Sequence, residues 1–597
     1  MRVRALTVVV LFAIGFTVVS GRLIYLQVLC HDKYQDEAMR AQYRVVPIPA
    51  MRGRILDCQQ RIFAQSVPVV DLYLDGKLAT EDPSKLDQLA QLIGMQPAAL
   101  RAQINPAKRN MLVASELDSS VADQLRALKY RPVILNDRVK RVYPNGWEAS
   151  HVVGFTNQKE KQNDNWKSPI NTEEGVAGIE RALDYCLAGL TGERKIVLDK
   201  TGKEIPAYRM ADRPAQNGCD VVLTIDQVIQ HSVEEEADKL MAKYQPETVS
   251  IIVSRPSTGE ILGMTNRPTY DPNDRKTMEN IANLRNCSIT DVYEPGSVFK
   301  IVTTSAVLNE GIANLDTPIF CENGVFYYAG TTLRDTHPNG TIPLHKALAE
   351  SSNIAFAKLG LALGSERVYN YARLMGFGDF AQDQASIFPG SKVKMALPGE
   401  QRGMLHPLKT WSKISPTRVP IGYEIGVTNL QMVMAMGVVA NGGKLLRPLF
   451  VKSIIGPDGR VVKNFEPEVV RQVISPQIAA DIRKALEGVV SDEGTAEGAK
   501  VQGFPAAGKT GTAKKYNNKL RDYEKGAYYS SFIGFVPADN PQFLISIQVN
   551  QPRGQVYGGK VAGPAFANIA TKVAQQLNMI SGDQPRILAK AKEGEQP

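Results

Sequence analysis

A serine and a lysine stand three positions apart in the segment Tyr293-Glu294-Pro295-Gly296-Ser297-Val298-Phe299-Lys300. The apolar run from Val298 to Leu308 predicts a buried helix, with Ser297 at its N-terminal end and Lys300 on the same face. An unprotonated lysine can take the proton of a serine hydroxyl, and the N–H groups at a helix N-terminus favour developing negative charge. The pair therefore indicates nucleophilic catalysis. Alone, it also fits a helix cap beside a surface lysine, and a second such spacing occurs at Ser391–Lys394 in a polar loop.

The chain contains one Ser-x-Asn motif, Ser351-Ser352-Asn353, directly before a predicted buried helix at Ile354–Leu359. The Ser351 hydroxyl could relay a proton to a leaving amine. The Asn353 amide could hydrogen-bond an amide carbonyl or a lysine. The alternative interpretation is a helix N-cap, because serine and asparagine are preferred there.

A third motif, Gly508-Lys509-Thr510-Gly511-Thr512, places a lysine and two threonines among small residues. Such a loop could hold a terminal carboxylate. The stretch from Gly503 to Thr510 also matches the GxxxxGK[ST] pattern of a phosphate-binding loop. That loop requires a buried strand before it and a helix after it, whereas polar segments stand on both sides here, so we favour the carboxylate site. Another Lys-Thr-Gly, Lys200-Thr201-Gly202, lies in a charged stretch that we interpret as a turn.

Strand patterns at both ends of the second half of the chain enclose helical patterns that would position these motifs. The predicted strands are Cys219–Thr224, Val249–Ser254, Glu260–Thr265, Tyr529–Val536 and Gln542–Asn550. A long helix is predicted at Asp226–Tyr244, and another at Thr428–Ala440, where Thr428 and Gln431 form a possible capping box. Strands at both ends with helices between them predict an α+β domain with an antiparallel sheet.

The N-terminal segment is apolar enough to cross a membrane. Ala5–Leu29 has 25 residues and a single charge, Arg22, and about 20 apolar residues suffice to span a bilayer. Arg2 and Arg4 precede the run, which predicts a cytoplasmic N-terminus with the rest of the chain outside. A cleaved signal peptide ending near Ser20-Gly21 is the alternative. We favour an uncleaved anchor because the apolar run continues past Arg22.

The composition is that of a folded protein, since 43% of the 597 residues are hydrophobic and 22% are charged. The net charge of +9 fits an anionic surface or polymer, and the lack of a long Lys/Arg block argues against a nucleic-acid partner. The six cysteines form no CxxC pair and the six histidines no HExxH motif. We therefore expect neither a disulfide scaffold nor a structural zinc site.

The three motifs occur in the order that marks the penicillin-interacting serine acyl transferases. On these motifs the chain resembles the class B penicillin-binding proteins, monofunctional D,D-transpeptidases of cell-wall synthesis, over nearly its whole length. Further segments that resemble motifs of this family are Arg22–Gln27, Arg52–Asp57, Arg141–Pro144, His151, Gly154-Phe155, Gly178–Glu180, Asp335–His337, Asn441–Gly443 and Gly558-Gly559. Cys58-Gln59-Gln60 departs from the family, which usually has Arg, a polar residue and Gly there.

The resemblance implies a penicillin-binding transpeptidase domain of the serine β-lactamase-like α+β fold, with a central antiparallel sheet flanked by helices. It also implies a mixed, elongated N-terminal pedestal domain and one transmembrane helix. The expected division is a cytoplasmic stub at 1–4, the anchor at 5–29, the pedestal at 30–215, the transpeptidase domain at 216–580 and a polar tail at 581–597.

The implied catalytic residues are Ser297, Lys300, Ser351 and Asn353, and the implied substrate-binding residues are Lys509, Thr510, Gly511 and Thr512. By this resemblance Ser297 attacks the penultimate D-alanine carbonyl of a stem peptide, and Lys300 is its base. Ser351 passes the proton to the leaving amine, and Asn353 orients the donor peptide. The backbone N–H groups of Ser297 and Thr512 form the oxyanion hole.

The resemblance further implies peptidoglycan stem peptides as substrates, β-lactams as inhibitors, and no metal or organic cofactor. The expected location is the inner (cytoplasmic) membrane, with a single pass and an extracytoplasmic bulk. A SEDS-type glycosyltransferase is an expected partner, because the sequence shows no lipid-II polymerase motif ahead of the pedestal. Other divisome membrane proteins are also expected, because Glu294–Ser297 is more similar to the division or sporulation branch of the family than to the elongation branch. The alternatives are an elongation-type transpeptidase, a D,D-carboxypeptidase or β-lactamase-like hydrolase, and a catalytically silent scaffold or β-lactam sensor. The pedestal and anchor argue against a hydrolase, and the intact motifs argue against a silent scaffold.

Overall fold

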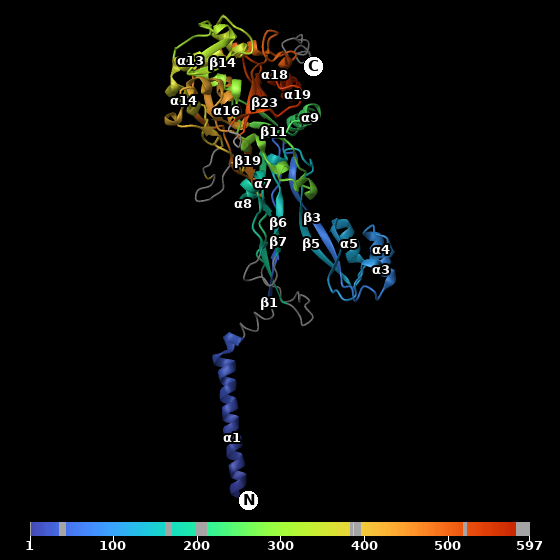
Figure 1. Ribbon diagram of the computed structural model, residues 1–597. Coiled ribbons are helices and arrows are strands. Elements are labelled where there is room, and N and C mark those ends of the chain that lie inside the picture. The colour runs from blue at the N-terminus through green and yellow to red at the C-terminus, as the bar shows by residue number, and fades with distance from the viewer. Residues whose placement is uncertain are drawn as a thin grey trace, which may run out of the picture. The chain divides into compact units, whose positions relative to one another are not determined.

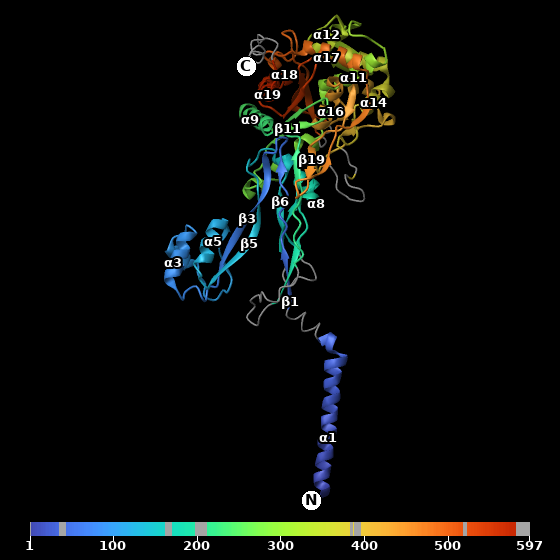
Figure 2. The same cartoon turned by 180° about the vertical axis from the view of Figure 1, so that it is seen from behind.

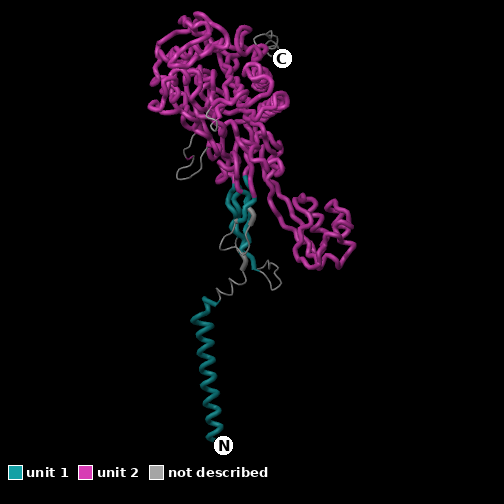
Figure 3. The backbone as a smooth tube through the Cα atoms, viewed as in Figure 1, with its two compact units in different colours: residues 1–52, 158–173, 188–218 teal, residues 53–157, 174–187, 219–597 magenta. Residues whose placement is uncertain are grey.

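The computed structural model describes residues 2–34, 43–161, 170–197, 212–382, 386, 396–517 and 522–580. Figure 1 and, from behind, Figure 2 show the elements along the chain. The chain divides into two compact units, coloured in Figure 3: residues 1–52, 158–173 and 188–218, and residues 53–157, 174–187 and 219–597. The three motifs belong to the second unit. The patterns at Ser391–Lys394 and Lys200–Gly202, and the expected tail at 581–597, lie outside the described residues.

The first unit contains a long apolar helix and a two-stranded sheet. Helix α1 (Arg2–Ile24) continues as a π-helical turn over Tyr25–Leu29. These 28 residues are long and apolar enough to cross a membrane, and their most apolar window is 0% buried. Strand β1 (Tyr43–Ile48) pairs antiparallel with β8 (Gly192–Val197). The helix therefore has the length, composition and exposure expected of the predicted anchor.

The second unit is built around a five-stranded antiparallel sheet in the order β11-β10-β24-β23-β22. Its strands are β10 (Thr248–Ser254), β11 (Ile261–Arg267), β22 (Ala507–Asn517), β23 (Asp522–Val536) and β24 (Phe543–Asn550). Every residue of β10, β11 and β24 is buried. A strand buried on both faces needs cover on both sides of the sheet.

Helices provide this cover. They are α9 (Gln227–Tyr244), α16 (Asn429–Ala440) and α19 (Gly563–Gln576). On one face, Gly263 of β11 lies against Ile229 of α9, and Gly534 of β23 lies against Phe566 of α19. On the other face, Asn429 at the start of α16 hydrogen-bonds serine hydroxyls of β10 and β24. The α+β prediction and the antiparallel sheet are confirmed.

Two of these helices begin where the sequence predicts. The Asp226 carboxylate caps α9 by accepting hydrogen bonds from the first-turn backbone N–H groups. Helix α16 begins with the predicted capping box, in which the Thr428 hydroxyl and the Gln431 amide each satisfy a backbone N–H of the other residue. Such caps satisfy donors that have no partner within the helix.

A second, mixed sheet has the strand order β20-β19-β9-β2-β3-β4, with β5 also paired to β3, and it joins strands that precede the five-stranded sheet in the chain to two strands that lie between β11 and β22. Its strands are β2 (Ile55–Leu56), β3 (Ile62–Leu74), β4 (Met111–Leu117), β5 (Val133–Val142), β9 (Asp220–Leu223), β19 (Val451–Ile455) and β20 (Val461–Asn464). Helices α3 (Pro83–Leu92), α4 (Pro97–Gln103) and α5 (Ser119–Ala127) complete a small separate core beside β3.

A buried ion pair joins three of the segments that resemble family motifs. Arg141 Nε donates to Glu180 Oε1 (2.7 Å), and Arg141 Nη1 donates to the carbonyl oxygen of Gly53 (2.8 Å). The Tyr143 hydroxyl lies 3.3 Å from the same carboxylate. Both charged side chains are at most 2% exposed. These residues stand in segments that resemble family motifs, and in the structure their hydrogen bonds connect those segments.

One expectation about local structure is wrong. The Lys509 motif was interpreted as a loop, but it lies inside β22 and pairs with β23 from Ala507 onward. Backbone pairing with β23 decides the conformation here, although the sequence after the motif is polar. A strand at this position also excludes the phosphate-binding loop, because that loop needs a helix directly after it.

Candidate active site

Ser297 lies in a single 3₁₀ turn, η5 (Gly296–Phe299), which runs directly into α11 (Lys300–Asn309). Side chains three residues apart eclipse in a 3₁₀ turn, so Ser297 and Lys300 share one side of it, as their spacing predicts. The N–H of Gly296 donates to the carbonyl oxygen of Gly422 (3.1 Å). A Cβ at Gly422 would lie 2.0 Å from the carbonyl oxygen of Gly296, so only glycine permits this approach. Ser297 is partly exposed, whereas Lys300 is fully buried.

The Lys300 amine contacts the second motif directly. Its Nζ lies 2.6 Å from the carbonyl oxygen and 3.2 Å from the Oγ of Ser351, and 2.9 Å from Asn353 Oδ1. A neutral amine has two N–H donors and one lone pair. It can therefore donate to the carbonyl and the amide while its lone pair accepts a proton from a hydroxyl.

Asp335 organises the second motif from the opposite side. Ser352 is the N-cap of α13 (Asn353–Leu363), and its Oγ accepts from the N–H of Ala355 (3.1 Å). The same hydroxyl donates to Asp335 Oδ2 (2.6 Å), and Asp335 Oδ1 accepts from the N–H of Asn353 (2.5 Å). The cap interpretation is thus correct for Ser352, while its neighbours Ser351 and Asn353 contact Lys300.

The third motif contacts the turn that carries Ser297 from the edge of the sheet. β22 is the terminal strand, and Lys509 on it is fully buried. Along the same strand, a Cβ at Gly511 would lie 2.8 Å from the Val298 side chain. A Cβ at Gly296 would lie 3.1 Å from that of Ala513. The turn that carries Ser297 therefore packs directly on the Lys509–Ala513 strand.

The hydroxyls of the third motif are held by neighbouring loops. Thr510 Oγ1 lies 2.9 Å from Thr495 Oγ1, and Thr512 Oγ1 accepts from the N–H of Gly558 (3.0 Å). A Cβ at Gly558 would lie 2.3 Å from the carbonyl oxygen of Gly511, which explains the glycine there. These contacts fix both threonine side chains before any ligand arrives.

The electrostatics of the site are set by two buried amines. Burial, and then the nearby charge of Lys509, hold the pKa of Lys300 well below its ordinary value, against the opposing effect of Asp335. Burial lowers the pKa of Lys509 to about 7. Desolvation disfavours the charged form of an amine. Burial therefore favours the neutral form of Lys300, and Lys509 is poised to become charged when an anion binds.

The structure gathers the predicted site residues of all three motifs around the turn that carries Ser297. They are Ser297, Lys300, Ser351, Asn353, Lys509, Thr510, Gly511 and Thr512. Two contributors were not predicted in these roles. Asp335 stood in a resembling segment without an assigned role, and Thr495 lies in a polar stretch with no distinguishing pattern. Only the fold brings these two to the site.

Comparisons with known proteins agree with this geometry. The family described as "Penicillin binding protein transpeptidase domain" matches residues 249–571, and "Penicillin-binding Protein dimerisation domain" matches residues 47–223. "Stage V sporulation protein D" of Bacillus subtilis is 31% identical over 585 residues, which cover 97% of this chain and 86% of that protein. "Peptidoglycan D,D-transpeptidase FtsI" of Escherichia coli is 28% identical over 600 residues, or 98% of this chain and 94% of that one.

A solved structure of penicillin binding protein 3 from Mycobacterium tuberculosis with ampicillin has a TM-score of 0.68 and 27% identity. It covers 91% of this chain and 98% of that one. Penicillin binding protein 2X from Streptococcus thermophilus shares the fold, with a TM-score of 0.77 at 22% identity, covering 90% of this chain and 80% of that one. The three motifs, the sheet with its covering helices and the matched domains together place this chain among the class B penicillin-binding proteins, with a D,D-transpeptidase domain of the serine acyltransferase type.

Proposed function

We propose that the protein cross-links peptidoglycan by D,D-transpeptidation through an acyl intermediate on Ser297. One observation carries the proposal: a fully buried Lys300 amine, held by Ser351 and Asn353 beside the serine turn. The names of the relatives as peptidoglycan D,D-transpeptidases support the reaction class.

The reaction begins when the neutral Lys300 amine takes the proton of the Ser297 hydroxyl. Ser297 Oγ then bonds to the penultimate D-alanine carbonyl carbon of a donor stem, and the carbonyl oxygen becomes an oxyanion. Backbone N–H groups of Ser297 and Thr512 stabilise that charge. As the tetrahedral intermediate collapses, the C–N bond breaks. The proton passes from Lys300 through the Ser351 hydroxyl, 3.2 Å away, to the leaving D-alanine amine.

The second half of the reaction runs in the opposite direction. An amine of a neighbouring stem loses its proton through the same pair and attacks the acyl carbon. The new amide forms as Ser297 Oγ leaves and recovers a proton. Lys509, Thr510 and Thr512 hold the donor's terminal carboxylate before the first bond breaks, and Asn353 orients the donor peptide through its amide.

The same proposal extends to location and partners. The apolar helix Arg2–Leu29 would anchor the protein in the cytoplasmic membrane by a single pass, with the catalytic unit outside. A SEDS-type glycosyltransferase would supply the nascent glycan, and other divisome membrane proteins would accompany it. The similarity to relatives named for sporulation and as FtsI supports a septal role over an elongation role.

Penicillin labelling of the full-length protein tests the acyl-serine chemistry. A fluorescent penicillin should label the protein stably at Ser297 and leave Ser297→Ala unlabelled. Loss of the label within seconds would indicate a hydrolase and not a transpeptidase, because the two enzymes differ in how fast water removes the acyl group from the serine. Absence of label from the folded parent would contradict the enzyme proposal. Cross-linked dimers formed from nascent glycan with the glycosyltransferase present would establish transfer to an amine.

A further inference from the structure

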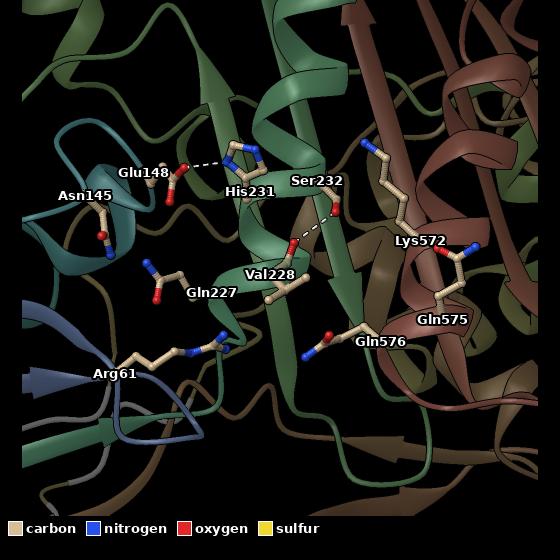
Figure 4. A pocket seen from close by; sticks show the side chains of 10 residues that line it. All are labelled: Arg61, Asn145, Glu148, Gln227, Val228, His231, Ser232, Lys572, Gln575 and Gln576. Atoms are coloured by element: carbon tan, nitrogen blue, oxygen red, sulfur yellow. Dashed lines mark hydrogen bonds and ion pairs between the residues drawn. The ribbon is translucent and has the colours of Figure 1, made fainter.

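A polar pocket of about 660 Å³ lies in the second unit, on a face that the catalytic motifs do not reach. Figure 4 shows side chains entering it from the turn after β2, from a turn near Glu148, from the first turns of α9 and from the end of α19. Helices α9 and α19 cover the sheet face opposite to α16. The volume of the pocket falls within the range of roughly 300–1,000 Å³ that is usual for small-molecule sites.

The charged groups of the pocket are neutralised by one another or by the residues behind them. The Arg61 guanidinium contacts Asp57 (2.6 Å) and Asp226 (3.1 Å). His231 Nδ1 lies 2.7 Å from Glu148 Oε1, as the dashed line in Figure 4 marks, and Lys572 pairs with Glu235. An anion such as a phosphate would have to displace a carboxylate from Arg61 and from Lys572, so the pocket is not built for anionic ligands.

Uncharged amides remain available for hydrogen bonding. The side chains of Gln227 and Gln575 line the pocket from opposite helices, and no described residue hydrogen-bonds their amide groups. Each amide offers both donors and an acceptor. Val228 is the sole aliphatic residue among those that line the pocket. A protein partner generally anchors through buried aromatic or aliphatic side chains, which this surface does not provide.

We propose that this pocket binds uncharged, N-acetylated saccharide units of the peptidoglycan glycan strand. Hydroxyl and acetamido groups match amide side chains that both donate and accept, and they require no free charge. The identity of the polymer rests on the proposed function, but saccharide binding itself does not depend on Ser297. A strand held at α9 and α19 would raise the local concentration of its stems near the nucleophile.

Saccharide titration of the full-length protein in detergent tests this proposal. The probe is tetra-N-acetylchitotetraose, which is uncharged and carries no stem peptide, and heat of binding and saturation-transfer NMR are the readouts. The parent should bind it, and Gln227→Ala/Gln575→Ala should bind at least about tenfold more weakly. Gln575→Trp, which fills the pocket, should also lose binding. Gln91→Ala, at an exposed glutamine of α3, is the matched control and should bind as the parent does.

Penicillin acylation at Ser297 provides the folding control and should be unchanged in every pocket variant. Ser297→Ala should bind the saccharide normally, so failure of the catalytic proposal and failure of this one are distinguishable. The proposal is overturned if the parent does not bind the saccharide, if the pocket variants bind it as tightly as the parent, or if inorganic phosphate binds at the pocket and excludes it.

Discussion

Two clusters of ionisable side chains are buried in the second unit, and they differ in whether each charge has an opposite charge beside it. Arg141 and Glu180 are both buried and face each other at 2.7 Å, so each charge is compensated by its partner. Lys300 and Lys509 are equally buried, but Lys300 faces neutral oxygens and the charge of Lys509 further lowers its pKa. The first arrangement pairs opposite charges, and the second favours the neutral form of an amine.

Charge compensation distinguishes residues that stabilise the fold from residues that are proposed to take part in the reaction. A compensated pair holds strands and loops together, and removing one partner leaves an uncompensated charge. An uncompensated amine contributes little to folding, because its burial is unfavourable, but burial favours its neutral, basic form. The proposed base role of Lys300 depends on this unfavourable burial, and mutations should separate the two clusters.

Replacement of Lys300 should have the largest effect on activity and little effect on stability. Lys300→Met should lower the rate of Ser297 acylation by about a thousandfold or more, because the serine loses its base. The free energy of unfolding should change by less than about 1 kcal/mol, since relief of amine desolvation offsets the lost hydrogen bonds. Stopped-flow penicillin acylation and chemical denaturation measure the two quantities. A Lys300→Met protein that does not fold would contradict the comparison.

Replacement of Glu180 should show the reverse pattern. Glu180→Gln leaves the buried Arg141 charge uncompensated and should destabilise the protein by about 3–5 kcal/mol. The double variant Arg141→Met/Glu180→Leu should recover most of that loss, because it removes both charges. Asp137→Asn breaks the exposed pair with Arg126 and serves as the control, with an expected change below about 0.5 kcal/mol in denaturation. Equal losses in the single and double variants would argue against a charge effect.

For substrates that carry a carboxylate, kcat/KM should fall at high pH because Lys509 loses its charge. Its pKa is about 7, so in the free enzyme its charge, and with it kcat/KM, should be lost as the pH rises through that value. The ascending limb belongs to Lys300, which must be deprotonated. Lys509→Met should remove the descending limb and move the ascending limb to higher pH, because the charge that lowers the pKa of Lys300 is gone. An ascending limb that does not move would show that the two amines are uncoupled.

Replacements of Ser351 and Ser352 should also differ in their effects on stability and on acylation rate, and this difference should be the smallest. Ser352→Ala removes the cap of α13 and should lower stability by about 1 kcal/mol with acylation largely retained. Ser351→Ala should leave stability nearly unchanged and slow acylation, because the proton relay is broken. Parallel melting curves and acylation rates of the two variants compare them directly. The same loss of rate from both would contradict the separate roles.

Much of the fold was predictable because its signals are local. The capping box of Thr428 and Gln431, the long helix that follows Asp226 and the paired strands each carry a pattern within a few residues. The grouping of the three motifs was predictable for another reason: three weak motifs in one order are specific together. Lys509 was assigned to a loop because its strand is stabilised by β23 rather than by its own sequence.

The rest of the site depends on contacts between residues far apart in the chain. Asp335 precedes the motif that it organises by 16 residues, counted to Ser351, and Thr495 lies 15 residues before Thr510. Gln227 and Gln575 line one pocket although they are 348 residues apart in the chain. No spacing within a single element predicts that such residues lie near one site, and only the assembled sheet and its covering helices bring them there.

The pH dependence of acylation reports whether Lys300 is neutral in the free protein. The second-order rate constant for benzylpenicillin acylation of Ser297 would be measured on the full-length protein across the pH range, with the adduct mapped by mass spectrometry. We expect the rise in rate with pH to be complete well below the ordinary lysine pKa of 10.5. A rate that continues to rise about tenfold per pH unit up to that value would show that Lys300 is charged at neutral pH and would overturn its proposed role as the base.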